Sequence, residues 1–187
     1  MEELIALSDQ MVGDGNTPWC IGVESGNATG WTATDWMEDL MLRTTTPENY
    51  DRWVSNELAF NSPEVLRAME IYGQFSRNDD YVAGGASSVA TTFFGDAPKG
   101  LFSTPASCLM HRQASFIPAF FPEKGAEIAA GEVDFFYFPP FASEDLGNPV
   151  LGAGTLYTMT KDSEATRAFF KYLQEPQAHE VGMNKGG

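Results

Sequence analysis

Apolar residues recur every three to four positions in several segments of this sequence, as in helices that bury one face. The most regular stripe consists of Ala33, Trp36, Met37, Leu40 and Met41. The same spacing, or a helix-start signal, predicts further helices over residues 2–12, 47–54, 63–75 and 163–173, and a short one opening at Pro176. Gly13 is expected to close the first of these helices.

Cap residues mark where some of these helices should begin. Residues 46–48 (Thr-Pro-Glu) and 62–64 (Ser-Pro-Glu) both place a hydroxyl, a proline and an acid in the order of an N-cap and a first turn. Ser163 is expected to cap the later amphipathic helix in the same way. The cap positions therefore support three helices beyond the central one.

Short apolar runs bounded by glycine, proline or polar residues predict strands. They lie at residues 19–23, 100–103, 133–138 and 155–160, and the third of them is expected to be buried. Residues 106–121 mix apolar and polar positions in a way that predicts a helix interrupted near Pro118. Because strands alternate with helices, the expected fold class is α/β with a parallel or mixed sheet.

Composition describes a globular chain with an acidic surface. Of 187 residues, 43% are hydrophobic and 13% are aromatic, which excludes a disordered chain. The formal net charge of -15 argues against a nucleic acid partner, because phosphate binding needs a basic stripe and the sequence has none. No apolar run approaches the ~20 residues of a membrane span. The chain opens as MEELIALSDQ without a leader, so we expect a fragment of a longer protein.

The two cysteines, Cys20 and Cys108, leave two alternatives open. They form no Cys-x-x-Cys motif, so they are either two buried thiols or one disulfide. The only histidines, His111 and His179, are too far apart for a helical metal pair. We therefore expect neither a metal site nor another cofactor.

Catalytic motifs are incomplete in this sequence. Residues 22–26 (Gly-Val-Glu-Ser-Gly) misplace the serine of a nucleophile elbow, and residues 152–155 lack the third glycine of a dinucleotide loop. Paired carboxylates remain an option, because Glu24 with Asp35 or Asp96 could serve a glycosidase. The simpler interpretation is that Asp35 and Asp96 cap a helix and a turn.

The stretch between the first predicted strand and the central helix has features of a ligand site. Residues 24–30 are rich in glycine, so backbone amides can approach a bound molecule. Thr32 and Asp35 have capping-box spacing, which predicts that the helix begins there. Trp31 would then be an aromatic plane just outside the helix.

Four segments of the chain resemble, in the same order, the extracellular solute-binding proteins of ABC sugar importers (family 1 type), particularly the α-glucoside-binding branch. They are GDGNTPWCIGVESGNATGWTATDWMEDLMLR, TTFFGDAP, CLMHRQASF and VLGAGTLYTMTKDSEATRAFFKYL. The resemblance implies a periplasmic-binding-protein-like fold of type II, with a mixed or parallel sheet flanked by helices. Residues 1–149 would form mainly one α/β lobe, and residues 150–187 a strand and helices returning toward an incomplete second lobe.

The resemblance also implies a non-catalytic receptor. Such proteins hold a sugar between two lobes that close on it by a hinge motion. The expected ligand is a neutral di- or oligosaccharide, in particular an α-glucoside, and the expected partner is a membrane permease. The implied location, periplasmic or extracellular, favours a disulfide between Cys20 and Cys108. The alternative function is a glycoside hydrolase or sugar-modifying enzyme that uses the paired carboxylates.

Eight residues acquire ligand-binding roles from the resemblance. Trp31 would stack on the apolar face of the sugar, and the remaining seven would form hydrogen bonds with its hydroxyls. These seven are Glu24, Asp35 and Asp96 as carboxylate acceptors, His111 and Arg112 on a later loop, and Gly152 and Gly154 through their backbone amides. Their structural alternatives are a local cap for Glu24, a surface pair for His111 and Arg112, and close strand packing for the two glycines.

Overall fold

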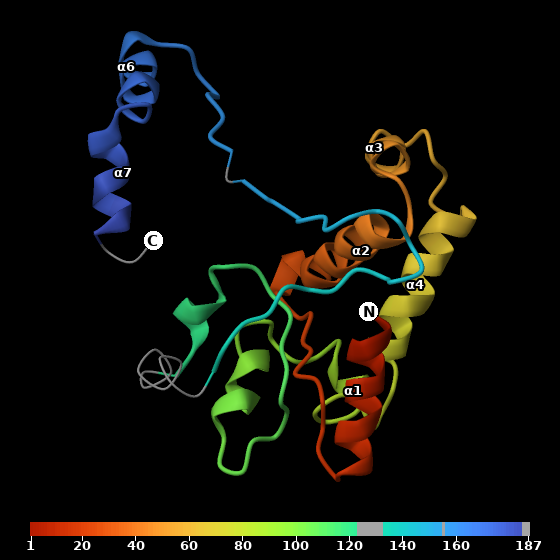
Figure 1. Ribbon diagram of the computed structural model, residues 1–187. Coiled ribbons are helices and arrows are strands. Elements are labelled where there is room, and N and C mark those ends of the chain that lie inside the picture. Colours follow the sequence, from red (N-terminus) through yellow and green to blue (C-terminus); the bar gives the residue numbers. More distant parts are fainter. Residues whose placement is uncertain (123–132, 155, 185–187) are drawn as a thin grey trace. The chain divides into compact units, whose positions relative to one another are not determined.

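The computed structural model describes residues 1–122, 133–154 and 156–184 of the chain. The chain divides into two compact units, Met1–Leu151 and Gly152–Gly187. In Figure 1 the first unit runs from red to cyan and the second is blue. Each unit is described by itself below.

Helices form most of the regular structure of the first unit. The α-helices are α1 (Glu2–Gly13), α2 (Trp31–Thr44), α3 (Pro47–Val54) and α4 (Pro63–Ser76). Short 3-10 turns cover η1 (Gly26–Ala28), η2 (Ala86–Ser88), η3 (Ala97–Phe102) and η4 (Ile117–Phe120). The central helix α2 packs against both α4 and α3.

The caps of α3 and α4 confirm the sequence prediction. The Thr46 side chain accepts a hydrogen bond from the Asn49 amide at 3.3 Å, and the Ser62 side chain accepts one from the Val65 amide at 3.5 Å. Each satisfies one backbone N–H that the first helical turn would otherwise leave unpaired.

The predicted cap of α2 is wrong. Gly30 is the N-cap, with a φ of 102° that favours glycine, and Trp31 is the first helical residue. The Thr32 hydroxyl donates instead to the Gly22 carbonyl at 3.2 Å, so it ties the helix to the segment before it. The capping box is absent because Thr32 lies inside the first turn and has this other partner.

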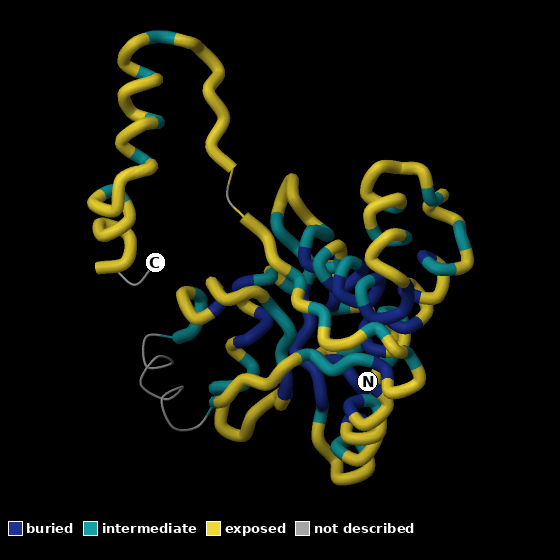
Figure 2. Tube along the Cα trace, turned by 45° about the horizontal axis from the view of Figure 1, so that its top comes forward, coloured by how far each residue is buried: buried dark blue, intermediate teal, exposed yellow. Residues whose placement is uncertain are grey.

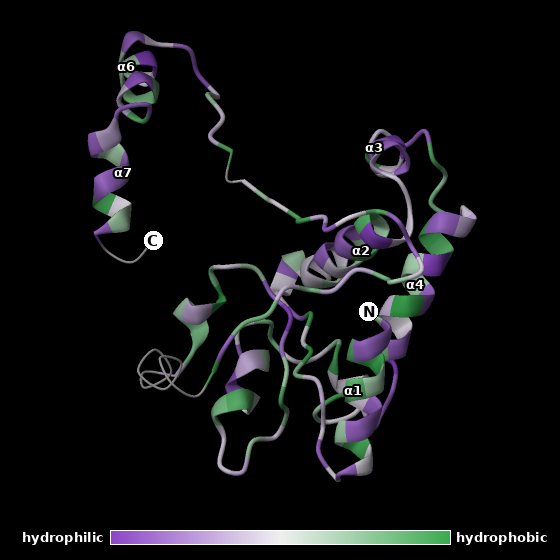
Figure 3. Ribbon diagram, in the orientation of Figure 1, coloured by the Kyte–Doolittle hydropathy of each residue, from purple (hydrophilic) through white to green (hydrophobic). Residues whose placement is uncertain are grey.

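The core of the first unit centres on Trp19, Trp36 and Phe75. Their ring centroids are 5.3 to 5.6 Å apart, and none of the three is more than 3% exposed. Trp19 also donates its indole N–H to the Ser8 hydroxyl on α1 at 3.0 Å. Figure 2 shows buried positions, in dark blue, gathered inside the first unit, and Figure 3 shows that α1, α2 and α4 carry both apolar and polar positions.

Residues 18–24 are extended and lie beside three stretches that are distant in sequence. Isolated parallel bridges join Trp19 to Val82, Trp19 to Met110 and Glu24 to Phe93. Within the described residues no bridge extends into a strand, so the predicted strand at 19–23 and the sheet are not confirmed. The main chain at Gly22 nevertheless lies so close to Thr92 that only glycine fits, because a Cβ on Gly22 would lie 2.6 Å from the Thr92 carbonyl oxygen.

Three other element predictions also fail. Residues 100–103 lie mostly in the 3-10 turn η3, and the helix predicted at 106–121 is limited to η4 near Pro118. Within that region the main chain of residues 109–110 instead donates to Thr17 and Pro18 carbonyls, which holds it extended. Residues 133–138 form no strand and are not buried, since Phe135 is 94% exposed.

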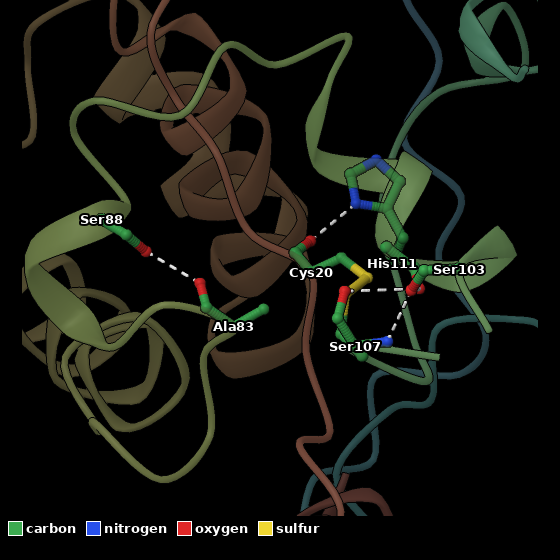
Figure 4. The surroundings of a disulfide bond; sticks show 8 residues. Cys20, Ala83, Ser88, Ser103, Ser107 and His111 are labelled. Atoms are coloured by element: carbon green, nitrogen blue, oxygen red, sulfur yellow. Dashed lines mark hydrogen bonds between the residues drawn. A yellow bond between two sulfur atoms is a disulfide. The ribbon is translucent and has the colours of Figure 1, made fainter. Parts of the chain in front are cut away.

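A disulfide joins Cys20 to Cys108, with a Cα–Cα distance of 5.4 Å (Figure 4). It attaches the extended segment at residues 18–24 to the stretch after η3. Gly100 lies against it, because a Cβ there would be 2.3 Å from the Cys108 sulfur. This glycine is therefore needed for space and not for an unusual backbone conformation.

The second unit contains α6 (Glu164–Tyr172) and α7 (Pro176–Met183). The predicted cap is confirmed, because the Ser163 side chain accepts a hydrogen bond from the Thr166 amide at 3.2 Å. Residue 155 of the predicted strand lies outside the described residues, and residues 156–160 form none. No helix in the described parts of the chain is long and apolar enough to cross a membrane.

Replacing both cysteines, as Cys20→Ala with Cys108→Ala, should lower the free energy of unfolding by about 2–4 kcal/mol. The bond closes a loop with a sequence separation of 88 residues, which restricts the unfolded chain. Urea unfolding of both proteins with and without dithiothreitol measures the difference. Reductant should shift the midpoint of the natural sequence alone, and an equal midpoint for the two oxidised proteins would contradict the prediction.

Candidate functional site

A cluster of aromatic side chains lies at the surface of the first unit around the start of α2. Its members are Trp31, Phe93, Phe94, Phe116 and Phe120. Trp31 is 5.1 Å from Phe94 and 5.8 Å from Phe116, measured between ring centroids. Phe93 and Phe116 are 37% and 42% exposed, so the cluster offers aromatic surface to solvent. We call these five residues the aromatic cluster.

Glycine permits this packing. A Cβ on Gly95 would lie 2.3 Å from a ring carbon of Phe120 and 2.8 Å from one of Phe93. Gly95 is buried and precedes Asp96, the N-cap residue of η3. Any side chain here would displace the two rings, so the shape of the aromatic cluster depends on this residue.

Main-chain hydrogen bonds of Glu24 hold it beside the aromatic cluster. Its amide donates to the Thr92 carbonyl, and its carbonyl accepts from the Phe94 amide, both at 3.0 Å. One of its carboxylate oxygens accepts from the Gly26 amide at 2.6 Å. The local cap is therefore present, and the second oxygen has no hydrogen-bond partner among the described residues.

Arg112 belongs to a partly buried ionic network and is not a surface arm. Its guanidinium pairs with Asp39 and donates to the Asp35 carbonyl oxygen at 3.0 Å. Asp39 also accepts from Arg43 at 2.7 Å, so one carboxylate that is 6% exposed serves two arginines. The charge is further stabilised because Arg112 lies 5.7 Å from the Trp36 ring centroid.

The Asp35 carboxylate lies next to this network without a hydrogen-bond partner among the described side chains. Burial raises the pKa of Asp35, the Arg112 charge lowers it, and the charges of Glu38 and Asp39 raise it. The structure thus brings Asp35 and Arg112 together. The contact with Arg112 is made by the backbone carbonyl of Asp35 and not by the Asp35 carboxylate.

His111 lies against the disulfide. Its Nδ1 is 2.7 Å from the Cys20 carbonyl oxygen, which can only accept, so Nδ1 carries the proton (Figure 4). The other ring nitrogen, Nε2, is buried without a hydrogen-bond partner in the described structure. Burial lowers the pKa of His111, the hydrogen bond to Cys20 opposes this change, and the Arg112 charge adds to it. The neutral ring therefore presents Nε2 as an acceptor.

A small cavity adjoins His111 and Arg112. It has a volume of about 10 Å³ and is also lined by Thr32, Trp36 and Gln113. That volume fits about one water molecule, far less than a disaccharide. Within the described residues no group of three His, Cys, Asp or Glu side chains could hold a metal ion.

The remaining predicted site residues lie elsewhere. Asp96 is exposed and pairs with Lys99 at 2.6 Å, and although it is the N-cap residue of η3, its side chain makes no capping hydrogen bond. Gly152 and Gly154 belong to the second unit and are exposed. A Cβ on either glycine would meet no atom within 4 Å, so close strand packing does not explain them in this structure.

Sequence reasoning missed most of the aromatic cluster and all of Asp39's role. The paired phenylalanines at 93–94 carried a signal, since two adjacent large aromatics before a glycine turn are candidates for exposed apolar surface. Asp39 is four residues from both Asp35 and Arg43, a spacing that places side chains on one helix face.

Comparisons with known proteins bear on what such a site binds. No protein-family model matches the chain, and no solved structure gives a significant match. The alpha-glucosides-binding periplasmic protein AglE of Rhizobium meliloti is 58% identical over 184 residues, which cover 98% of this chain and 40% of AglE. The resemblance to periplasmic solute-binding proteins is confirmed.

A second relative is more distant. The osmoprotective compounds-binding protein GgtB of Synechocystis sp. is 43% identical over 185 residues, which cover 99% of this chain and 43% of GgtB. The chain thus spans less than half the length of both AglE and GgtB. These two relatives differ in the ligand that their names state.

His111 should make stability depend on pH. Because its pKa is lower in the folded state than in the unfolded chain, the unfolded state binds more protons as the pH falls below about 6.5. The free energy of unfolding should therefore fall below pH 6.5, by at most about 1.4 kcal/mol per pH unit from this group. Urea unfolding between pH 5 and 8 measures it, and His111→Asn should flatten this part of the slope.

His179→Asn makes the same chemical change on the exposed surface of α7 and is the control. Identical slopes for the natural sequence and the His111 variant would refute the assignment of a buried neutral imidazole.

Proposed function

We propose that this chain is part of the carbohydrate-binding component of an ABC-type importer. The carrying observation is its 58% identity to AglE, whose name states that it binds alpha-glucosides, over 98% of the chain. The proposed ligand is a neutral di- or oligosaccharide, in particular an α-glucoside. Because GgtB is named for osmoprotective compounds, the ligand class rests on the higher identity to AglE.

The chemistry of the aromatic cluster supports a sugar. A pyranose presents an apolar C–H face and a rim of hydroxyls, so its sites combine aromatic planes with carboxylates and amides. Trp31 supplies the plane, and the unpartnered carboxylate oxygen of Glu24, whose main chain pairs with that of Phe94, is an acceptor. Asp35, Asp96, His111, Arg112, Gly152 and Gly154 stay candidates for the rest of the site.

Within that set the described contacts favour some residues over others. His111 Nε2 is an acceptor without a partner, and the Asp35 carboxylate is similarly free. Arg112 is already held by Asp39, and Asp96 by Lys99. We therefore place His111 and Asp35 ahead of Arg112 and Asp96 as direct ligand contacts.

We further propose that residues 1–149 form mainly one lobe of a type II binding-protein fold and that residues 150–187 return toward the other lobe. The three parallel bridges on residues 18–24 support a parallel arrangement at the centre of the first lobe. Ligand would shift an equilibrium between open and closed forms through contacts made only when closed.

A periplasmic or extracellular location follows from the name of AglE and agrees with the disulfide, which persists in oxidising compartments. The partner would be the membrane permease of the importer. AglE and GgtB are named as binding proteins, which favours a receptor over a glycoside hydrolase.

The test is a sugar titration of the 187-residue chain and of a chimera in which this chain replaces the matching stretch of AglE. Tryptophan emission should change saturably with at least one of sucrose, maltose, trehalose and glucose, and product analysis should recover the sugar intact. Released product would favour the hydrolase. A lack of response in the chimera, while AglE itself responds, would overturn the proposal.

Trp31→Ala should weaken sugar binding by the chimera by at least about two- to tenfold, since aromatic packing of this kind is worth about 0.5–1.5 kcal/mol beyond the area that it buries. Trp53→Ala, on α3 and packed against Tyr50, removes the same side chain elsewhere and should leave affinity unchanged. Calorimetric titration with the preferred sugar measures both. Equal affinity of the Trp31 variant and its parent would remove Trp31 from the site.

A further inference from the structure

Arg43, in the last turn of α2, has a side chain that is only 1% exposed. It makes an ion pair with Asp39 at 2.7 Å, one turn earlier on the same helix. The rest of its guanidinium donates to main-chain carbonyl oxygens far along the sequence. It reaches Phe138 at 2.7 Å and Pro139 and Pro149 at 3.2 Å each.

These carbonyls belong to two separate stretches of the chain, which we call the first pass and the second pass. Phe138 and Pro139 lie on the first pass, and Pro149 lies on the second, two residues before Leu151 ends the first unit. The Tyr137 hydroxyl also donates to the Pro149 carbonyl, at 2.6 Å. One guanidinium and one phenol therefore join the two passes at the point where the chain leaves the unit.

Proline explains why side chains make this connection. Pro139 and Pro149 have no backbone N–H, so neither can donate to the other pass as residues of a regular ladder do. A guanidinium carries five donors in a fixed fork and can replace the missing ones. The rings of Tyr137 and Phe138 lie 5.3 and 5.0 Å from the Arg43 guanidinium carbon, which adds cation–π attraction.

We propose that Arg43 and Tyr137 form a clamp that holds the two passes together, and that the segment so held is a fixed base for the hinge motion of the proposed function. The clamp itself is supported by the hydrogen bonds of Arg43 and Tyr137 described above. Its role in the closing of the lobes on a sugar rests on the proposed sugar-binding function. Arg43 and Tyr137 are thus positioning residues, which affect binding through the chain segments that they hold.

A purely structural role for Arg43 predicts something different. If Arg43 only neutralises Asp39, a lysine would satisfy the same charge, and removing the Tyr137 hydroxyl would change nothing nearby. If it is a clamp, Arg43→Lys keeps the charge but cannot bridge several carbonyls, because an ammonium lacks the planar fork. Tyr137→Phe removes one of the connecting hydrogen bonds and keeps the ring.

The local test is a distance measurement within the first unit of the 187-residue chain. Nitroxide labels at Asn148→Cys and Glu70→Cys, both exposed positions, report how firmly the second pass is held. The distance distribution should be narrow in the labelled parent, broader in Tyr137→Phe and at least about twofold broader in Arg43→Lys. The double variant should be at least as broad as Arg43→Lys alone, because it removes both side-chain donors to the Pro149 carbonyl.

Arg67→Lys is the matched control. Arg67, on α4, pairs at 2.7 Å with Glu144, which lies in the segment that connects the two passes, and this pair is more exposed than that of Arg43. The variant Arg67→Lys makes the same chemical change as Arg43→Lys and should leave the distance distribution between the two labels unchanged. Distributions in Arg43→Lys and Tyr137→Phe that match the parent would overturn the clamp.

The second test concerns the hinge and uses the AglE chimera. Arg43→Lys should weaken sugar affinity by about two- to thirtyfold, the range for substitutions that change coupling without contacting ligand. Arg67→Lys should bind like the parent. Unchanged affinity with a broadened distribution would overturn the hinge role and leave the clamp. If the parent chimera binds no sugar, the proposed function fails, while the label measurement still decides on the clamp.

Discussion

The extended segment at residues 18–24 is the constraint on which the first unit depends. Its main chain pairs with three stretches around Val82, Phe93 and Met110, and Trp19 fills the core between α1, α2 and α4. Cys20 adds a covalent bond to the same segment. The site features follow from it, because the Glu24 main chain positions Phe94 and the Cys20 carbonyl fixes the His111 ring.

The helices were predictable from sequence because their signals are local. The hydroxyl and proline at 46–47 and 62–63 determine where α3 and α4 begin, whatever those helices pack against. The predicted strands are not confirmed in the described residues, because strand pairing depends on neighbours distant in sequence, which local composition does not report. Residues 133–138 have the composition of a buried strand, yet they are mostly exposed. Trp31 was predicted to lie just outside the central helix, but it is the first residue of α2, and its role in ligand binding stays a prediction.

The candidate site shows the same division between local and distant information. Spacing alone could place Asp35, Asp39 and Arg43 on one face of α2, since they are four residues apart. It could not show that Arg112, from a loop 73 residues later, would share Asp39. A buried carboxylate between two arginines is costly to desolvate, and its worth depends on every partner being present. This network therefore links the helix, the His111 loop and the two passes held by Arg43 as one unit.

The disulfide also determines the topology of the folded chain. A bond between residues 20 and 108 closes a covalent ring that contains α2, α3 and α4, while α1 and residues 109–151 lie outside it. A single protease cut at any position from 21 to 107 would open this ring without separating the two pieces. A single cut between residues 109 and 151 would release everything that follows it from covalent attachment. The half of the first unit that carries Trp31 is thus protected against loss by backbone cleavage, and the half that carries residues 137–149 is not.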